Sequence, residues 1–198
     1  MLLKIVTTLL LLASGGVGKP THKIPSGKWS RLPNITLDCE QYPRQEHGVA
    51  LIGDDVYVLG GILPWNGTTY PTTNIVQKYN MKTGIWIETA PMPAALNHVN
   101  VAVVNGNIYY IGGMEEVDAY AGTVAYWNAT GKSAVYSPST NKWTVLPSMP
   151  EGREIGSAAT LVASETIYLP GGLTYTNTTN DQEGTVVSMN FSLSNCPF

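Results

Sequence analysis

The stretch Val56-Tyr-Val-Leu-Gly-Gly61 decides the fold, because its Tyr-x-x-Gly-Gly phrase returns twice along the chain. The later copies are Tyr109-Tyr-Ile-Gly-Gly113 and Tyr168-Leu-Pro-Gly-Gly172, and the interval before the third copy is longer than the interval before the second. Tryptophans at positions 29, 86 and 143 are evenly spaced. Short landmarks of fixed sequence with variable spacing between them indicate stacked supersecondary units joined by loops of different length.

Each phrase ends the second strand of a predicted hairpin. In the second unit the hairpin turn is Asn105-Gly106 between apolar runs, and these two residue types accept the positive φ angles of a tight turn. A third strand is expected to end at a tyrosine and a fourth to begin at a tryptophan. Four short antiparallel strands per unit predict a propeller blade. The expected strands are residues 48–52, 56–59, 75–79 and 86–89, then 99–104, 107–111, 133–136 and 143–146, then 158–162 and 166–169.

These landmarks resemble the kelch repeat, in which a Gly-Gly doublet follows an apolar strand and a tyrosine and a tryptophan flank a turn. The resemblance covers about residues 45–198 together with the Trp29 segment. It implies an all-β fold of kelch-type β-propeller blades, each with four antiparallel strands. The chain departs from the usual pattern at Asn80 and Ser137, where kelch repeats carry aspartate after the tyrosine, and at Pro170, since proline is disfavoured inside a central strand.

The repeats number about three, at residues 46–93, 97–150 and 153–198, and follow an N-terminal segment at 19–45. The third repeat ends where its fourth strand should begin, since aligning it with the first repeat sets Phe198 against Trp86. Lys28-Trp-Ser-Arg-Leu-Pro33 has the pattern of an orphan outer strand. If it completed the third blade, Trp29 would pack near Tyr168 and Phe191. Because propellers have four to eight blades, we expect instead a partial or truncated ring, with an open arc that oligomerises as the alternative.

The composition excludes several classes of protein. The chain has 198 residues, of which 43% are hydrophobic and 13% charged, with a net charge of −3. An acidic balance argues against a nucleic-acid surface, and the hydrophobic share argues against a disordered chain. Twenty glycines and 13 prolines suit many short strands joined by turns better than a helical bundle.

Residues 1–18 resemble a secretory signal peptide. Lys4 supplies a basic start, residues 5–12 form an apolar run, and small residues follow. Cleavage after Gly18 is favoured over cleavage after Gly15. The apolar run is shorter than a membrane-spanning helix requires, so we expect a secreted, extracellular protein with no membrane span after cleavage, and an uncleaved anchor is the alternative.

Two further patterns agree with export. Cys39 and Cys196 lie near opposite ends of the mature chain and could form a disulfide in an oxidising compartment; otherwise each pairs outside this chain or stays free. Asn-x-Ser/Thr sequons, at which N-glycosylation takes place, begin at Asn34, Asn66, Asn128, Asn177 and Asn190.

Candidate binding residues fall on the face formed by the loops after the second strands and the linkers between blades. Loop residues on a rigid scaffold are the usual binding positions of such folds. An arginine could hold a carboxylate through two hydrogen bonds, and an aromatic ring could stack on a sugar or a side chain. The candidates, all expected to be exposed, are Arg44, Trp65, Tyr70, Glu115 and Arg153.

The sequence predicts a binding or interaction module for a protein or glycan ligand, with no catalytic residues, no metal site and no cofactor. The histidines have no His-x-His spacing, and neither a nucleophile elbow nor a phosphate loop is present. The kelch resemblance leaves two enzymatic alternatives, an extracellular oxidase similar to galactose oxidase and a sialic-acid mutarotase. A fragment without independent function is the third alternative.

Overall fold

The computed structural model describes residues 27–37, 40–41, 43–117, 126–176 and 189–192, and every regular element within these ranges is a β-strand. The chain divides into two compact units, residues 1–32 and 33–198, according to the contacts between its residues. All of the described sheets lie in the second unit. The predicted signal peptide, both cysteines and Asn177 lie outside the described residues. Within the described ranges, no helix is long and apolar enough to cross a membrane.

The first blade is an antiparallel sheet in the order β3-β4-β5-β6. Its strands are Gly48–Ile52, Asp55–Leu59, Val76–Asn80 and Ile85–Thr89, which agrees with the sequence prediction to within one residue at each end. The register sets Leu51 opposite Val56, Val56 opposite Tyr79, and Tyr79 opposite Trp86. The tyrosine and tryptophan of the repeat are therefore cross-strand neighbours, with ring centroids 5.0 Å apart.

The second blade has the order β7-β8-β9-β10, with strands Val101–Val104, Asn107–Val117, Tyr126–Ser137 and Lys142–Leu146. Its middle strands are much longer than predicted. A register shift between Ile111 and Gly113 lets β8 and β9 continue beyond the glycine doublet as a hairpin. The short strand β13, Tyr175–Thr176, pairs with β9 at Asn128 and Trp127. The expectation of a loop immediately after Gly113 is therefore wrong.

In the part of the chain that the structure describes, the third blade comprises three strands in the order β11-β12-β14. These are Leu161–Ala163, Thr166–Leu169 and Met189–Ser192. Residues 27–35, which include the expected orphan strand at 28–33, have no strand assigned, and the prediction that they pair with a blade remains a prediction. Two short strands, β1 (Thr36–Leu37) and β2 (Glu40–Gln41), pair with each other before the first blade.

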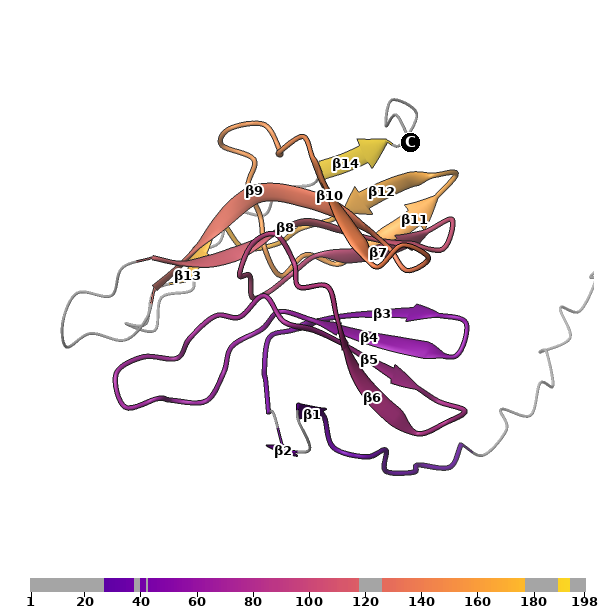
Figure 1. Cartoon of the computed structure of the whole chain (residues 1–198). Helices are drawn as coiled ribbons and strands as arrows, with labels where there is room; N and C mark the ends of the chain where they lie inside the picture. The colour runs from indigo at the N-terminus through magenta and orange to yellow at the C-terminus, as the bar shows by residue number, and fades with distance from the viewer. Residues whose placement is uncertain (1–26, 38–39, 42, 118–125, 177–188, 193–198) are drawn as a thin grey trace, which may run out of the picture. The chain divides into compact units, whose positions relative to one another are not determined.

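Hydrophobic cores lie between successive blades, which stack in chain order (Figure 1). One core joins the first two blades through residues such as Leu59, Tyr57 and Tyr136. The other joins the second and third blades through residues such as Tyr109 and Ile167. Stacked four-stranded antiparallel sheets with cores between them confirm the predicted all-β, propeller-type fold.

The glycine doublet repeats because the next linker passes close to it. Gly60 and Gly112 have φ angles of 58° and 70°, where side chains are strained. A Cβ atom would lie 2.2 Å from the Leu96 carbonyl oxygen at Gly60 and 2.5 Å from the Ile155 carbonyl oxygen at Gly112. The sequence landmark thus marks the points where consecutive blades join.

Candidate binding site

The long loops of the blades come together around the β8–β9 hairpin. The Glu116 carboxylate in β8 accepts hydrogen bonds from Thr69 Oγ1 at 2.8 Å and from the Thr72 backbone N–H at 3.2 Å, both in the first blade's loop. From the third blade, β13 pairs with β9. The hairpin therefore fixes loops of two neighbouring blades, and so gives this surface a defined shape.

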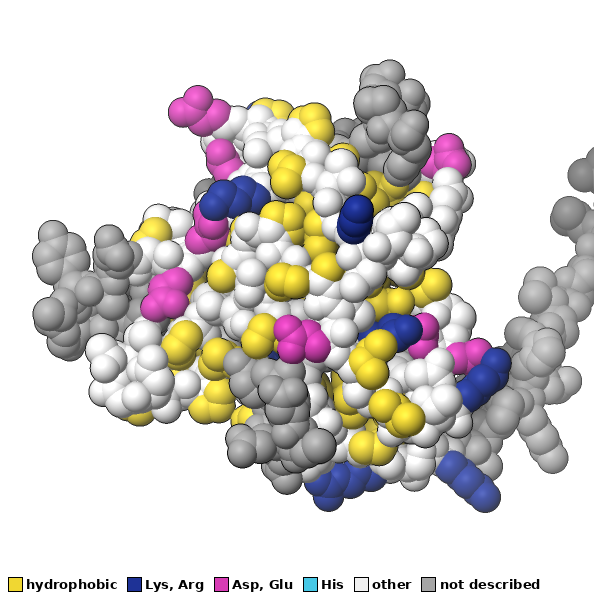
Figure 2. All heavy atoms as spheres, viewed as in Figure 1, with side chains coloured by type: hydrophobic (Ala, Val, Ile, Leu, Met, Phe, Trp, Pro, Cys, Tyr) yellow, Lys and Arg dark blue, Asp and Glu magenta, His cyan; other side chains and the backbone are white. Residues whose placement is uncertain are grey.

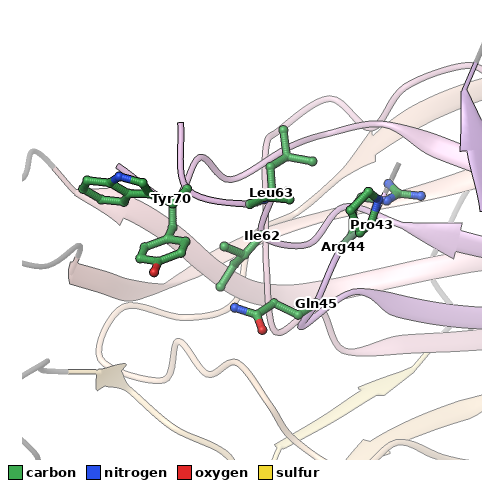
Figure 3. Close-up of a pocket in the computed structure, with 8 residues that line it drawn as sticks. Pro43, Arg44, Gln45, Ile62, Leu63 and Tyr70 are labelled. Carbon is green, nitrogen blue, oxygen red and sulfur yellow. The ribbon is translucent and has the colours of Figure 1, made fainter. Parts of the chain in front are cut away.

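A pocket of about 380 Å³ lies at the start of the first blade's loop. In Figure 3, Tyr70 stands at one end, Pro43 and Arg44 at the other, and Ile62 and Leu63 between them. The Trp65 ring is tilted against Tyr70, with centroids 5.1 Å apart. Trp65 is 53% exposed and Tyr70 37% exposed, so both rings are accessible from solvent. The lining residues are Pro43, Arg44, Gln45, Ile62, Leu63, Pro64, Trp65 and Tyr70.

The prediction that Arg44 is exposed is wrong, because only 9% of the residue is accessible. Its Nη1 donates to the carbonyl oxygens of Gly60 at 3.1 Å and Ile75 at 2.8 Å, and its Nη2 donates to Gln77 Oε1 at 2.6 Å. Gln77 is fully buried and donates in turn to the Thr36 carbonyl oxygen at 2.5 Å. Through Gln77, the guanidinium therefore links the backbone at Thr36 to the end of β4, and Arg44 also lines the pocket.

Glu115 and Arg153 lie apart from this pocket. Glu115 stands in β8 rather than in a loop, forms an ion pair with Lys132, and lines a second hollow with Thr72 and Glu116. Arg153 is exposed in the turn after β10. The structure thus brings together Arg44, Trp65 and Tyr70, and leaves the other two candidates elsewhere.

The linkers between blades form a ladder of backbone hydrogen bonds, here called the linker ladder, at Glu46, His98 and Ser157. All three have positive φ angles, and His98 N donates to Glu46 O and Ser157 N to His98 O, each at 2.8 Å. His98 Nε2 also lies 3.3 Å from Glu46 Oε2. Burial lowers the pKa of His98, although Glu46 opposes this effect. Burial and the nearby Arg44 charge likewise lower the pKa of His47.

Two residues that hold the candidate site in place, Gln77 and Glu116, were not identified from the sequence. Gln77 occupies the register position that Ala134 occupies in the second blade. A polar residue at a repeat position that is apolar in the next blade could have identified Gln77 from the sequence. The sequence pattern places Glu116 in a loop together with Glu115, and its hydrogen bonds to the first blade's loop had no sequence signal. Of the sequons, Asn34, Asn66 and Asn128 are exposed. Among the described residues, no three His, Cys, Asp or Glu side chains group as metal ligands.

Comparison with known proteins agrees with this architecture. The family model described as the kelch motif matches residues 43–93, which span the first blade. The chain is a kelch-repeat protein with a propeller-type fold.

Relatives of this chain are considerably longer. Kelch-like protein terF of Aspergillus terreus is 70% identical over 187 residues, which are 94% of this chain and 40% of that protein. Kelch repeat and BTB domain-containing protein 12 of Danio rerio is 27% identical over 77% of this chain and 23% of its own length. The solved structure of YjhT is 20% identical, with a TM-score of 0.55 over 72% of this chain and 37% of that one. The chain therefore spans less than half the length of these proteins.

Proposed function

We propose that this chain is a secreted interaction module that binds a protein partner through the pocket between Arg44 and Tyr70. The observation that carries this proposal is the pair of accessible rings, Trp65 and Tyr70, at one end of a mostly apolar pocket. Large aromatic residues in apolar pockets carry much of the energy of protein interfaces. A loop held in place by Glu116 offers these rings with little ordering left to do on binding.

The lining favours an apolar side chain of the partner. Ile62, Leu63 and two prolines supply the apolar wall, whereas the Arg44 guanidinium is engaged by backbone oxygens and Gln77. A ligand carboxylate would have to compete with those hydrogen bonds. A hydrophobic or aromatic side chain, in contrast, would gain by leaving water.

Selection from a phage-displayed peptide library on the purified chain tests the pocket. We expect enriched peptides with an apolar anchor, whose affinity falls at least about tenfold in Trp65→Ala and Tyr70→Ala, as for interface hot spots. Val145→Ala is the matched control, because Val145 is an exposed apolar residue in β10 outside the pocket. Peptides that bind the Trp65→Ala variant equally well would contradict the proposal. Binding to a glycan on an array that is lost in Trp65→Ala would instead assign the pocket to a sugar ligand.

The proposal that the chain is secreted rests on the basic and apolar pattern of residues 1–18 and on the exposure of three sequons. Expression in a fungal host should release the chain into the medium with a new N-terminus at Lys19 and a mass that falls on glycosidase treatment. Retention inside the cell with an intact Met1 would contradict it. Peptide mapping without reduction would show whether Cys39 pairs with Cys196.

A further inference from the structure

We propose that Asn66 carries an N-linked glycan whose first sugars cover the Trp65 ring, so that this one modification closes the pocket to a partner. The inference rests on the proposed function, because N-glycosylation takes place on secreted proteins, and it adds the regulation of the same pocket. It is carried by the turn that holds Asn66 and by the exposed ring directly before it.

The first blade's long loop, between β4 and β5, contains a turn at residues 66–69. The Asn66 backbone N–H donates to the Thr69 carbonyl oxygen at 3.1 Å and closes this turn. The complete sequon, Asn66-Gly67-Thr68, lies in the turn, and all three of its residues are exposed. The acceptor asparagine is therefore presented in a loop rather than in a strand.

The Asn66 side chain is held so that its amide nitrogen is accessible. Its Oδ1 accepts hydrogen bonds from the backbone N–H groups of Thr68 and Thr69, both at 2.9 Å. Its Nδ2, the atom that a sugar would be joined to, donates to no group among the described residues. Gly67 has a φ angle of 100°, and a Cβ atom added to it would meet nothing within 4 Å. A sugar on Nδ2 would therefore break no hydrogen bond and would have open space beside it.

The modification forms a C–N bond between the anomeric carbon of the first sugar and Asn66 Nδ2. The donor is an oligosaccharide carried on a lipid pyrophosphate, and its C–O bond to the phosphate breaks. The amide loses one proton, and the lipid pyrophosphate leaves. Because the amide keeps Oδ1, the two hydrogen bonds from Thr68 and Thr69 remain. Glycosylation is therefore compatible with the observed turn.

The other described sequons are placed differently. Asn128 stands inside β9, and the threonine of its sequon, Thr130, is buried. The sequon of Asn34 runs into β1 at Thr36. Neither asparagine lines the pocket. Among the described sequons, only that of Asn66 lies wholly in a loop and directly follows a residue of the pocket.

Trp65 provides the surface that the first sugars would cover. It directly precedes Asn66, so the two Cα atoms are about 3.8 Å apart. Its ring is 53% exposed and lies against Tyr70. A sugar ring has an apolar face of C–H groups, and covering the indole with this face removes apolar area from water. The glycan and the apolar side chain of a partner would thus occupy the same ring, and only one of them fits there at a time.

Secretion from a fungal host followed by glycopeptide mapping tests the modification. Substitutions of Thr68 separate the sequon from the turn, because Thr68 bonds to Asn66 through its backbone N–H. Thr68→Ala removes the acceptor sequence, and Thr68→Ser keeps it. We expect a glycan on Asn66 in the native chain and in Thr68→Ser, and none in Thr68→Ala. A secreted native chain with Asn66 unmodified would overturn this inference alone, whereas a chain retained in the cell with an intact Met1 would overturn the proposed secretion as well.

Radical footprinting of the tryptophans tests the cover without any partner. Oxidation of Trp65 should be several-fold lower in the native chain and in Thr68→Ser than in Thr68→Ala. Trp143, in β10 of the second blade, is the internal control and should be oxidised equally in all three chains. Equal oxidation of Trp65 in the native chain and in Thr68→Ala would overturn the cover.

Peptide binding separates the regulation from the pocket itself. Peptides selected on Thr68→Ala should bind the native chain and Thr68→Ser at least about tenfold more weakly, as when a hot-spot ring is removed. Equal affinity for the three chains would overturn the regulation. If no selected peptide depends on Trp65 in the Thr68→Ala chain, the proposed pocket fails and its regulation fails with it, while mapping and footprinting still decide the glycan and its cover.

Discussion

The two faces of the first blade show how much a neighbouring sheet changes the environment of equivalent residues. On the face toward the second blade, Leu59 is fully buried, and on the opposite face Leu51 is 56% exposed. The tryptophans of the repeat differ in the same way. Trp143 Nε1 donates to the Ala90 carbonyl oxygen of the preceding blade at 2.9 Å, whereas Trp86 Nε1 is buried with no acceptor among the described residues. The repeat supplies the same side chains, and the next blade decides what they contribute. In the view of Figure 2, hydrophobic side chains also gather at the surface between scattered charges.

The largest expected effect comes from a matched pair of leucines. Leu59→Ala should lower the free energy of unfolding by about 2–5 kcal/mol, because it leaves a cavity in the core between blades. Leu51→Ala should change it by about 0.5 kcal/mol or less, because the side chain is exposed. Urea unfolding measures both changes. Equal losses would mean that the exposed face is covered in solution.

Arg44→Met is expected to cost about 2–3 kcal/mol, since it removes the donor to the buried oxygens of Gly60 and Gln77 and one of the two donors to the Ile75 carbonyl oxygen. Arg153→Met, at an exposed turn, is the control and should be close to neutral. Chemical denaturation of the two variants compares them. A neutral Arg44→Met would show that its hydrogen bonds are replaced by water and that the guanidinium is available to a ligand.

The tryptophan pair gives a smaller difference. Trp143→Phe removes the donor to Ala90 and should cost about 1 kcal/mol beyond the loss of ring area. Trp86→Phe removes a buried N–H that has no acceptor among the described residues and should be less costly. Urea unfolding of the two variants measures the difference. A larger loss for Trp86→Phe would indicate that its indole N–H has an acceptor in solution.

The smallest effect is expected from two histidines, His98 in the linker ladder and His47 beside it. The pKa of His47 and that of His98 are lowered in the fold, so the unfolded chain binds protons more readily than the folded chain. Their contribution to stability is complete above pH of about 6.5 and is lost as the pH falls through the folded pKa. The free energy of unfolding measured from about pH 8 down to about pH 5 should therefore decrease, and the double variant His47→Gln, His98→Gln should flatten this part of the curve. An unchanged slope would assign the effect to other groups.

Some features of the site could be predicted from sequence and others could not. Trp65 and Tyr70 were recognisable, because aromatic residues in a long polar loop have no strand in which to be buried. Arg44 was misjudged because it precedes the first strand like a linker residue, and only the fold reveals the carbonyl oxygens that surround its guanidinium. Glu115 was misjudged because nothing local distinguishes a long hairpin from a loop after a glycine doublet.

The sequence by itself determined the strands, their order and the positions where blades join. Alternation of apolar residues, turn residues such as Asn105-Gly106, and paired glycines act over a few neighbouring residues, so they can be read locally. Only the tertiary structure decided which faces are buried, which arginine is structural, and how loops of different blades are held together. Those outcomes depend on contacts between residues far apart in the chain: Glu116 reaches Thr69 across 47 positions, and Trp143 reaches Ala90 across 53.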